Sequence, residues 1–77
     1  MRHRKLWPTS RPPRPSQVKQ GDVLMRGQKL HVVGVGGRNV AGRWQPMIST
    51  IDDDDQVHVL AWDEDGGRWV EDLGAQP

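Results

Sequence analysis

Short runs of β-forming residues, separated by glycine and aspartate, fill the chain from Val18 onward. No window in this part repeats apolar residues at the spacing of an amphipathic helix. The runs predict five strands, at about residues 22–26, 28–35, 40–51, 57–63 and 68–73. Such short strands favour an all-β fold, either a small five-stranded antiparallel barrel of the SH3-like kind or a curled sheet.

Turn residues support these strand limits. Asp65, Gly66 and Gly67 form the clearest turn, because an Asp-Gly pair readily adopts the positive φ of a tight hairpin. Residues 36–39 suit a longer hairpin loop, and four consecutive aspartates at residues 52–55 suit a polar loop. Pro46 has no amide hydrogen, so the third strand should bend there or lie at a sheet edge.

The aromatic residues limit the core that the chain can build. The 77 residues form one small domain with four Trp and no Phe or Tyr. Trp44, Trp62 and Trp69 are therefore the expected buried or half-buried anchors, with Trp7 outside that group. The absence of cysteine excludes disulfides and a thiolate zinc site, and the cytoplasm is the expected compartment (the host cytoplasm for a viral protein).

Composition divides the chain into an arm, residues 1–17, and a small β-barrel domain, residues 18–77. The arm is basic and rich in proline, and its few apolar side chains are Met1, Leu6 and Trp7. Ordering residues 1–16 would cost roughly 16 to 32 kcal/mol of backbone entropy, whereas burying three side chains returns about 5 to 9 kcal/mol. The arm is therefore expected to be disordered when free.

Charge follows the same division. Residues 1–20 hold six Lys or Arg and no acid, whereas residues 21–77 hold five bases and ten acids. This difference predicts that the cationic arm folds back weakly on a mildly anionic domain until a stronger polyanion displaces it.

One run of residues in the domain resembles part of a known fold. Residues 21–35, GDVLMRGQKLHVVGV, resemble the opening hairpin of SH3-like barrels, which small phage head-to-tail joining proteins and KOW-type modules of translation and transcription factors share. The resemblance covers about 15 residues and implies a fold more than a function. The phage proteins are usually longer and lack a basic proline-rich arm, so no functional residue is carried over.

No motif predicts catalysis. The glycines of residues 32–37 lack the strand-helix-strand context of a dinucleotide site, and residues 52–55 lack the ligand spacing of a calcium loop. His31 and His58 have no clearly placed third metal ligand, and Ser49 has no recognisable base. We expect a protein that is not an enzyme and has no metal, no cofactor and no small-molecule substrate.

The leading functional hypothesis is a small regulatory or accessory protein, from a phage or other mobile element, that engages nucleic acid or a nucleic-acid-handling complex, for example in transcription. Its basic arm would follow a phosphate backbone. The pair Arg-Trp occurs twice, at residues 43–44 and 68–69. In each pair the Trp could face the core and the Arg the solvent, as neighbours on a strand do, or both could be exposed as a platform for bases. The predicted nucleic-acid contacts are Arg2, Arg4, Lys5, Arg11, Arg14, Lys19, Arg43 and Arg68.

Other functions remain open. The acidic loops could mimic phosphates, which would make the protein an inhibitor or adaptor of a polymerase or nuclease. The predicted protein contacts are then Asp52, Asp53, Asp54, Asp55, Asp63 and Asp65. A virion connector subunit, a solubilising tail and a proline-rich ligand at residues 12–15 are further alternatives. No apolar run is long enough for a membrane span.

Overall fold

The computed structural model describes residues 5–75, and it confirms the all-β prediction. The elements are β1 (Leu6–Trp7), β2 (Val23–Met25), β3 (Lys29–Val40), β4 (Arg43–Ile51), β5 (Val57–Asp63), β6 (Arg68–Glu71) and a single 3-10 turn, η1 (Leu73–Ala75). The predicted strands correspond to β2 through β6, whereas β1 lies where no strand is predicted. Within the described range, no helix is long and apolar enough to cross a membrane.

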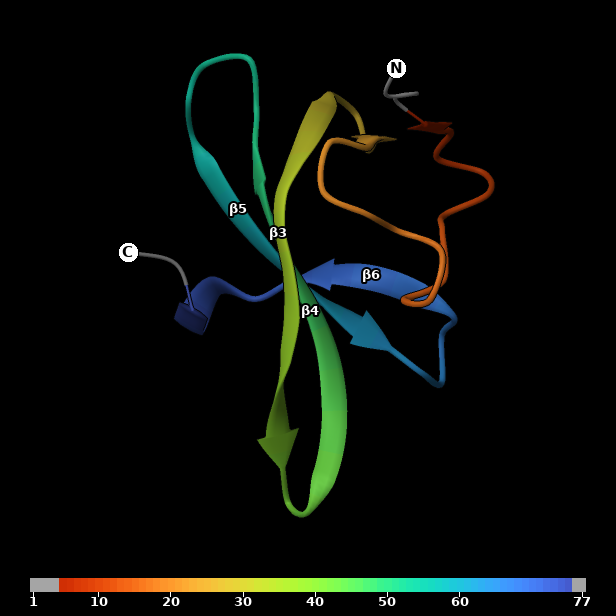
Figure 1. Ribbon diagram of the computed structural model, residues 1–77, viewed down its shortest axis with the longest axis vertical. Coiled ribbons are helices and arrows are strands. Elements are labelled where there is room, and N and C mark those ends of the chain that lie inside the picture. Colours follow the sequence, from red (N-terminus) through yellow and green to blue (C-terminus); the bar gives the residue numbers. More distant parts are fainter. Residues whose placement is uncertain (1–4, 76–77) are drawn as a thin grey trace.

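The strands form one open, twisted sheet in the order β1-β2-β3-β4-β5-β6 (Figure 1). Neighbours from β2 to β6 pair antiparallel, while β1 runs parallel to β2. Within residues 5–75 the edge strands β1 and β6 do not pair with each other, so the sheet is not closed into a barrel. The structure thus has a curled, mixed sheet of six strands in place of a five-stranded antiparallel barrel.

The β3–β4 hairpin is longer than predicted and projects from one end of the molecule (Figure 1). Residues 36–39, predicted as its loop, continue β3, and the turn falls at Ala41 and Gly42. These two residues have φ of 52° and 79°, as a two-residue hairpin turn requires. Pro46 pairs with Gly37 of β3 but lies beyond Met47, the last residue of β4 that pairs with β5. It therefore occupies a local sheet edge, in agreement with the prediction.

The core gathers apolar side chains from the sheet and from the N-terminal segment, which is residues 5–19. Trp62 and Trp69 meet edge to face, with ring centroids 5.1 Å apart. The other two tryptophans are opposite to the prediction: Trp44 is 63% exposed, and Trp7 packs against the core. Trp44 is exposed because it lies near the tip of the hairpin, beyond the part of β4 that β5 covers. The buried cluster is Val18, Leu24, Leu30, Val32, Ile48, Leu60, Trp62 and Trp69.

Residues 5–17 lie against the sheet, which differs from the disorder predicted for residues 1–17; residues 1–4 are outside the described range. β1 pairs with β2, and Pro13 is fully buried. Ordering these residues costs less backbone entropy than ordering a chain of the same length without proline, because each proline already restricts the unfolded chain. The sheet also supplies hydrogen-bond partners from far along the sequence, which add to the gain from burial.

Candidate functional site

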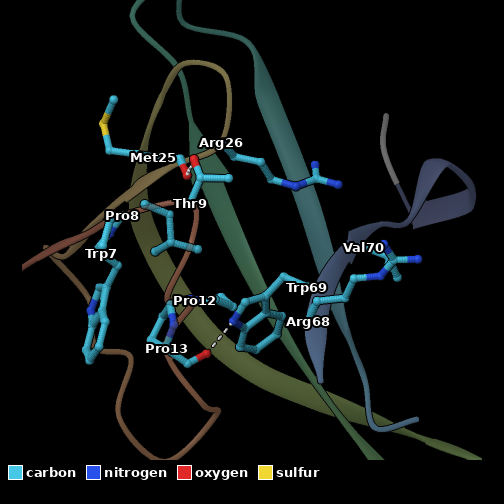
Figure 2. A pocket seen from close by; sticks show the side chains of 11 residues that line it. Trp7, Pro8, Thr9, Pro12, Pro13, Met25, Arg26, Arg68, Trp69 and Val70 are labelled. Atoms are coloured by element: carbon cyan, nitrogen blue, oxygen red, sulfur yellow. Dashed lines mark hydrogen bonds between the residues drawn. The ribbon is translucent and has the colours of Figure 1, made fainter. Parts of the chain in front are cut away.

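A pocket of about 440 Å³ lies between β2 and β6, where the sheet stays open and the N-terminal segment crosses the gap (Figure 2). Its residues come from three parts of the chain that only the fold brings together, so no local sequence pattern predicts it. The lining residues are Trp7, Pro8, Thr9, Pro12, Pro13, Leu24, Met25, Arg26, Arg68, Trp69 and Val70.

Two hydrogen bonds across the pocket hold the segment in place. Trp69 Nε1 donates to the carbonyl oxygen of Pro13 over 2.8 Å, and this contact is buried. Thr9 Oγ1 donates to the carbonyl oxygen of Met25 over 2.7 Å. Figure 2 draws both bonds as dashed lines, one toward β6 and one toward the end of β2. The segment is therefore tied to both strands that flank the opening.

The buried carboxylate of Asp22 holds Trp7, one of the residues that line the pocket. Its Oδ2 accepts hydrogen bonds from Trp7 Nε1 and from the backbone amide of Lys19, each over 3.1 Å. The amide of Val23 donates to the carbonyl of Lys5 over 2.9 Å and continues the pairing of β1 with β2. Asp22, the only acid in the first 50 residues, thus orients the Trp7 ring.

Two arginines line the pocket, and Lys5 lies beside one of its lining residues, Trp7. Lys5 Nζ lies 4.8 Å from the centroid of the Trp7 ring, a cation–π contact. Arg26 and Arg68 line the pocket, and in Figure 2 both side chains extend to the same side, away from Trp7. Their ion pairs are long and partly solvated, 3.8 Å from Arg26 to Glu71 and 3.9 Å from Arg68 to Asp63. Pairs of this kind contribute little energy, so both guanidinium groups can be recruited by an anion.

The structure divides the predicted nucleic-acid contacts. Lys5, Arg11, Arg14 and Lys19 are each exposed on the N-terminal segment, and Arg68 lies at the pocket. No ion pair among residues 5–75 involves Lys5, Arg11, Arg14 or Lys19. The segment is therefore held by packing and hydrogen bonds, and its charges face solvent.

Three predicted contacts fall elsewhere. Arg43 is exposed at the start of β4, next to the turn of the projecting hairpin, and so belongs to a different part of the surface. Arg2 and Arg4 lie outside the described residues.

The four aspartates between β4 and β5 do not form one acidic patch. Asp52 is buried, and its Oδ1 accepts the amides of Asp54 and Gln56, over 2.8 and 2.9 Å. Asp53 Oδ1 lies 3.0 Å from His31 Nε2, while Asp54 and Asp55 are exposed. Asp52 as a protein contact stays a prediction, and in the structure its carboxylate is bonded within the loop.

His58 lies between two carboxylates. Its Nε2 is 2.7 Å from Asp52 Oδ2, and its Nδ1 is 3.2 Å from Glu71 Oε1. Both ring nitrogens can donate only in the protonated imidazole. The bond to Asp52 is the main cause that raises the pKa of His58 above its ordinary 6.5, against the effect of burial. The same bond is the main cause that lowers the pKa of Asp52 below its ordinary 3.8.

This cluster joins the β4–β5 loop to β6 and accounts for His58 as a hydrogen-bonded structural histidine. Nowhere in residues 5–75 do three or more His, Asp or Glu side chains form a group that could hold a metal ion.

No protein-family model matches the chain, and no curated protein or solved structure matches it significantly.

Proposed function

We propose that the protein is a non-enzymatic accessory protein that binds single-stranded nucleic acid on the face formed by the N-terminal segment and the pocket between β2 and β6. The observation that carries the proposal is the set of exposed cations on the segment. Lys5, Arg11, Arg14 and Lys19 have no ion-pair partner within residues 5–75. Of the five bases that follow, Arg26, Arg38 and Arg68 do have one, while Lys29 and Arg43 do not within the same range. Unneutralised cations on one ordered segment suit a phosphate backbone.

The pocket supports a single strand over a duplex. Its volume falls in the range of ligand pockets, about 300 to 1,000 Å³, and the half-buried Trp7 ring lines it under the Lys5 ammonium group. Bases stack on aromatic rings with little regard to sequence, but only unpaired bases present their faces.

Salt dependence follows from the same set of cations. Each phosphate contact to a single strand changes the slope of log affinity against log salt by about 0.7. Engagement of the four segment cations together with Arg26 and Arg68 predicts a slope of about −4.

Fluorescence anisotropy with labelled single-stranded and double-stranded DNA and RNA tests the proposal. Point substitutions are required, because deleting the segment would remove Trp7 and Pro13 from the packed structure. Arg11→Gln should weaken single-strand binding and reduce the salt slope by about 0.7. Arg43→Gln removes the same charge from the projecting hairpin and should leave binding unchanged. Equal effects of the two substitutions, or no binding by the native chain, would refute the assignment.

A second candidate is an adaptor or inhibitor that uses the acidic surface. Asp52 is buried, whereas Asp63 and Asp65 line a groove with Glu64 and the exposed Trp44. This arrangement favours a positively charged partner.

A further inference from the structure

A second hollow lies between the projecting β3–β4 hairpin and the β5–β6 turn, with a volume of about 660 Å³. Trp44 and Pro46 line it from β4, and Asp63, Glu64 and Asp65 line it from the end of β5 and the turn. Val70 lines both this groove and the pocket between β2 and β6, so the two hollows lie close to the same residue of β6.

The Trp44 ring is exposed and yet held in position. A Cβ atom built on Gly37 would lie 2.5 Å from Trp44 Cζ2, so the indole lies directly against the β3 backbone. Beside it, Gln45 accepts a hydrogen bond from Arg38 Nε over 3.0 Å. Arg38 also pairs with Asp72 over 2.8 Å, which ties the hairpin to the chain after β6. The Trp44 side of the groove is therefore preorganised for a ligand.

The opposite wall is anionic. Asp65 is exposed, and Asp63 has one long contact of 3.9 Å to Arg68. Glu64 accepts a hydrogen bond from Trp62 Nε1 over 2.7 Å, which fixes its carboxylate near the groove. Arg43 is the single base of the lining, so the groove carries three acids against one base.

We propose that this groove binds an arginine or lysine side chain from a basic peptide segment of a partner protein. The cation would lie over the exposed face of Trp44 and form ion pairs with Asp63 and Asp65. A fixed aromatic face attracts cations, and nearby carboxylates increase that attraction. Three acids exclude phosphate from the same place by repulsion, so this site is separate from the proposed nucleic-acid face.

Titration with a labelled nonapeptide that contains three arginines, followed by NMR of the indole N–H signals, tests this proposal. The same peptide with citrulline in place of arginine is the uncharged probe of similar shape. We expect the arginine peptide to shift the Trp44 signal, and the citrulline peptide to bind at least about threefold more weakly. Equal binding of the two peptides, or a response confined to Trp7, would overturn the proposal.

Variants separate the groove from overall charge. Trp44→Ala and the pair Asp63→Asn/Asp65→Asn should each weaken peptide binding by about three- to tenfold. The pair Asp54→Asn/Asp55→Asn removes the same charge from the exposed β4–β5 loop and should have no effect. Equal losses from both pairs would show that attraction is nonspecific and would refute the site.

Two further measurements distinguish loss of the groove from a folding defect and from self-association. Urea unfolding of the Trp44→Ala chain should remain one cooperative transition, because most of this ring is exposed. Nucleic-acid binding should also be unchanged, so failure here is distinguishable from failure of the function proposed above. Sedimentation of the native chain should show a monomer. Self-association abolished by Trp44→Ala would assign the groove to a second copy and overturn the partner assignment.

Discussion

The bond between Trp69 Nε1 and the Pro13 carbonyl should contribute most of the attachment of the N-terminal segment to β6. It spans 2.8 Å between residues 56 positions apart, and both are buried. Trp69→Phe keeps a ring against Trp62 but leaves the carbonyl without a donor, at a cost of about 1 to 3 kcal/mol. The smaller ring adds about 1 kcal/mol of lost packing. We expect the free energy of unfolding to fall by about 2 to 4 kcal/mol.

Urea unfolding measures this change, and Trp62→Phe is the matched control. Trp62 Nε1 donates to Glu64, an exposed carboxylate that water can hydrate when the donor is lost. Trp69→Phe should therefore cost about 1 to 2 kcal/mol more than the control. It should also speed hydrogen exchange at the amide of Val18, which donates to Arg14 within the segment. Equal stability losses with unchanged exchange at Val18 would refute the idea that this bond holds the segment.

Two other perturbations follow from local geometry and charge. Gly37→Ala should destabilise the chain by about 1 to 3 kcal/mol in thermal unfolding, because its Cβ would contact the Trp44 ring and the backbone of β4; Gly36→Ala, which meets open space, should be nearly neutral, and the opposite order would contradict the packing described. Because the pKa of His58 is raised, its contribution to stability is complete below pH 6.5 and is lost as pH rises through the higher folded pKa. Because the pKa of Asp52 is lowered, its contribution is present above pH 3.8 and is lost as pH falls through the lower folded pKa. The temperature midpoint of unfolding should therefore decrease below about pH 3.8 and above about pH 6.5. If the midpoint of His58→Gln falls as steeply with rising pH as that of the native chain, the assignment is refuted.

Strand positions and several turns are predictable from this sequence, because they depend on neighbouring residues. β5 occupies the predicted residues, and the turn that follows it contains Gly67 with φ of 63°. The glycines of residues 36–37 show the limit of local reasoning. They resemble a loop in sequence, but pairing with Met47 and Pro46 keeps them in a strand.

The sequence by itself determined the all-β class and a basic N-terminal segment followed by an acid-rich domain. Only the tertiary structure decided which tryptophans are buried and where the segment lies. Trp7 and Trp69 reach Asp22 and Pro13, far along the chain, whereas no part of β5 pairs beside Trp44. Burial depends on which distant residues surround a side chain, and that arrangement cannot be read from composition or from neighbouring residues. The same reason explains why the pocket and the Trp44 groove emerge only in the folded sheet.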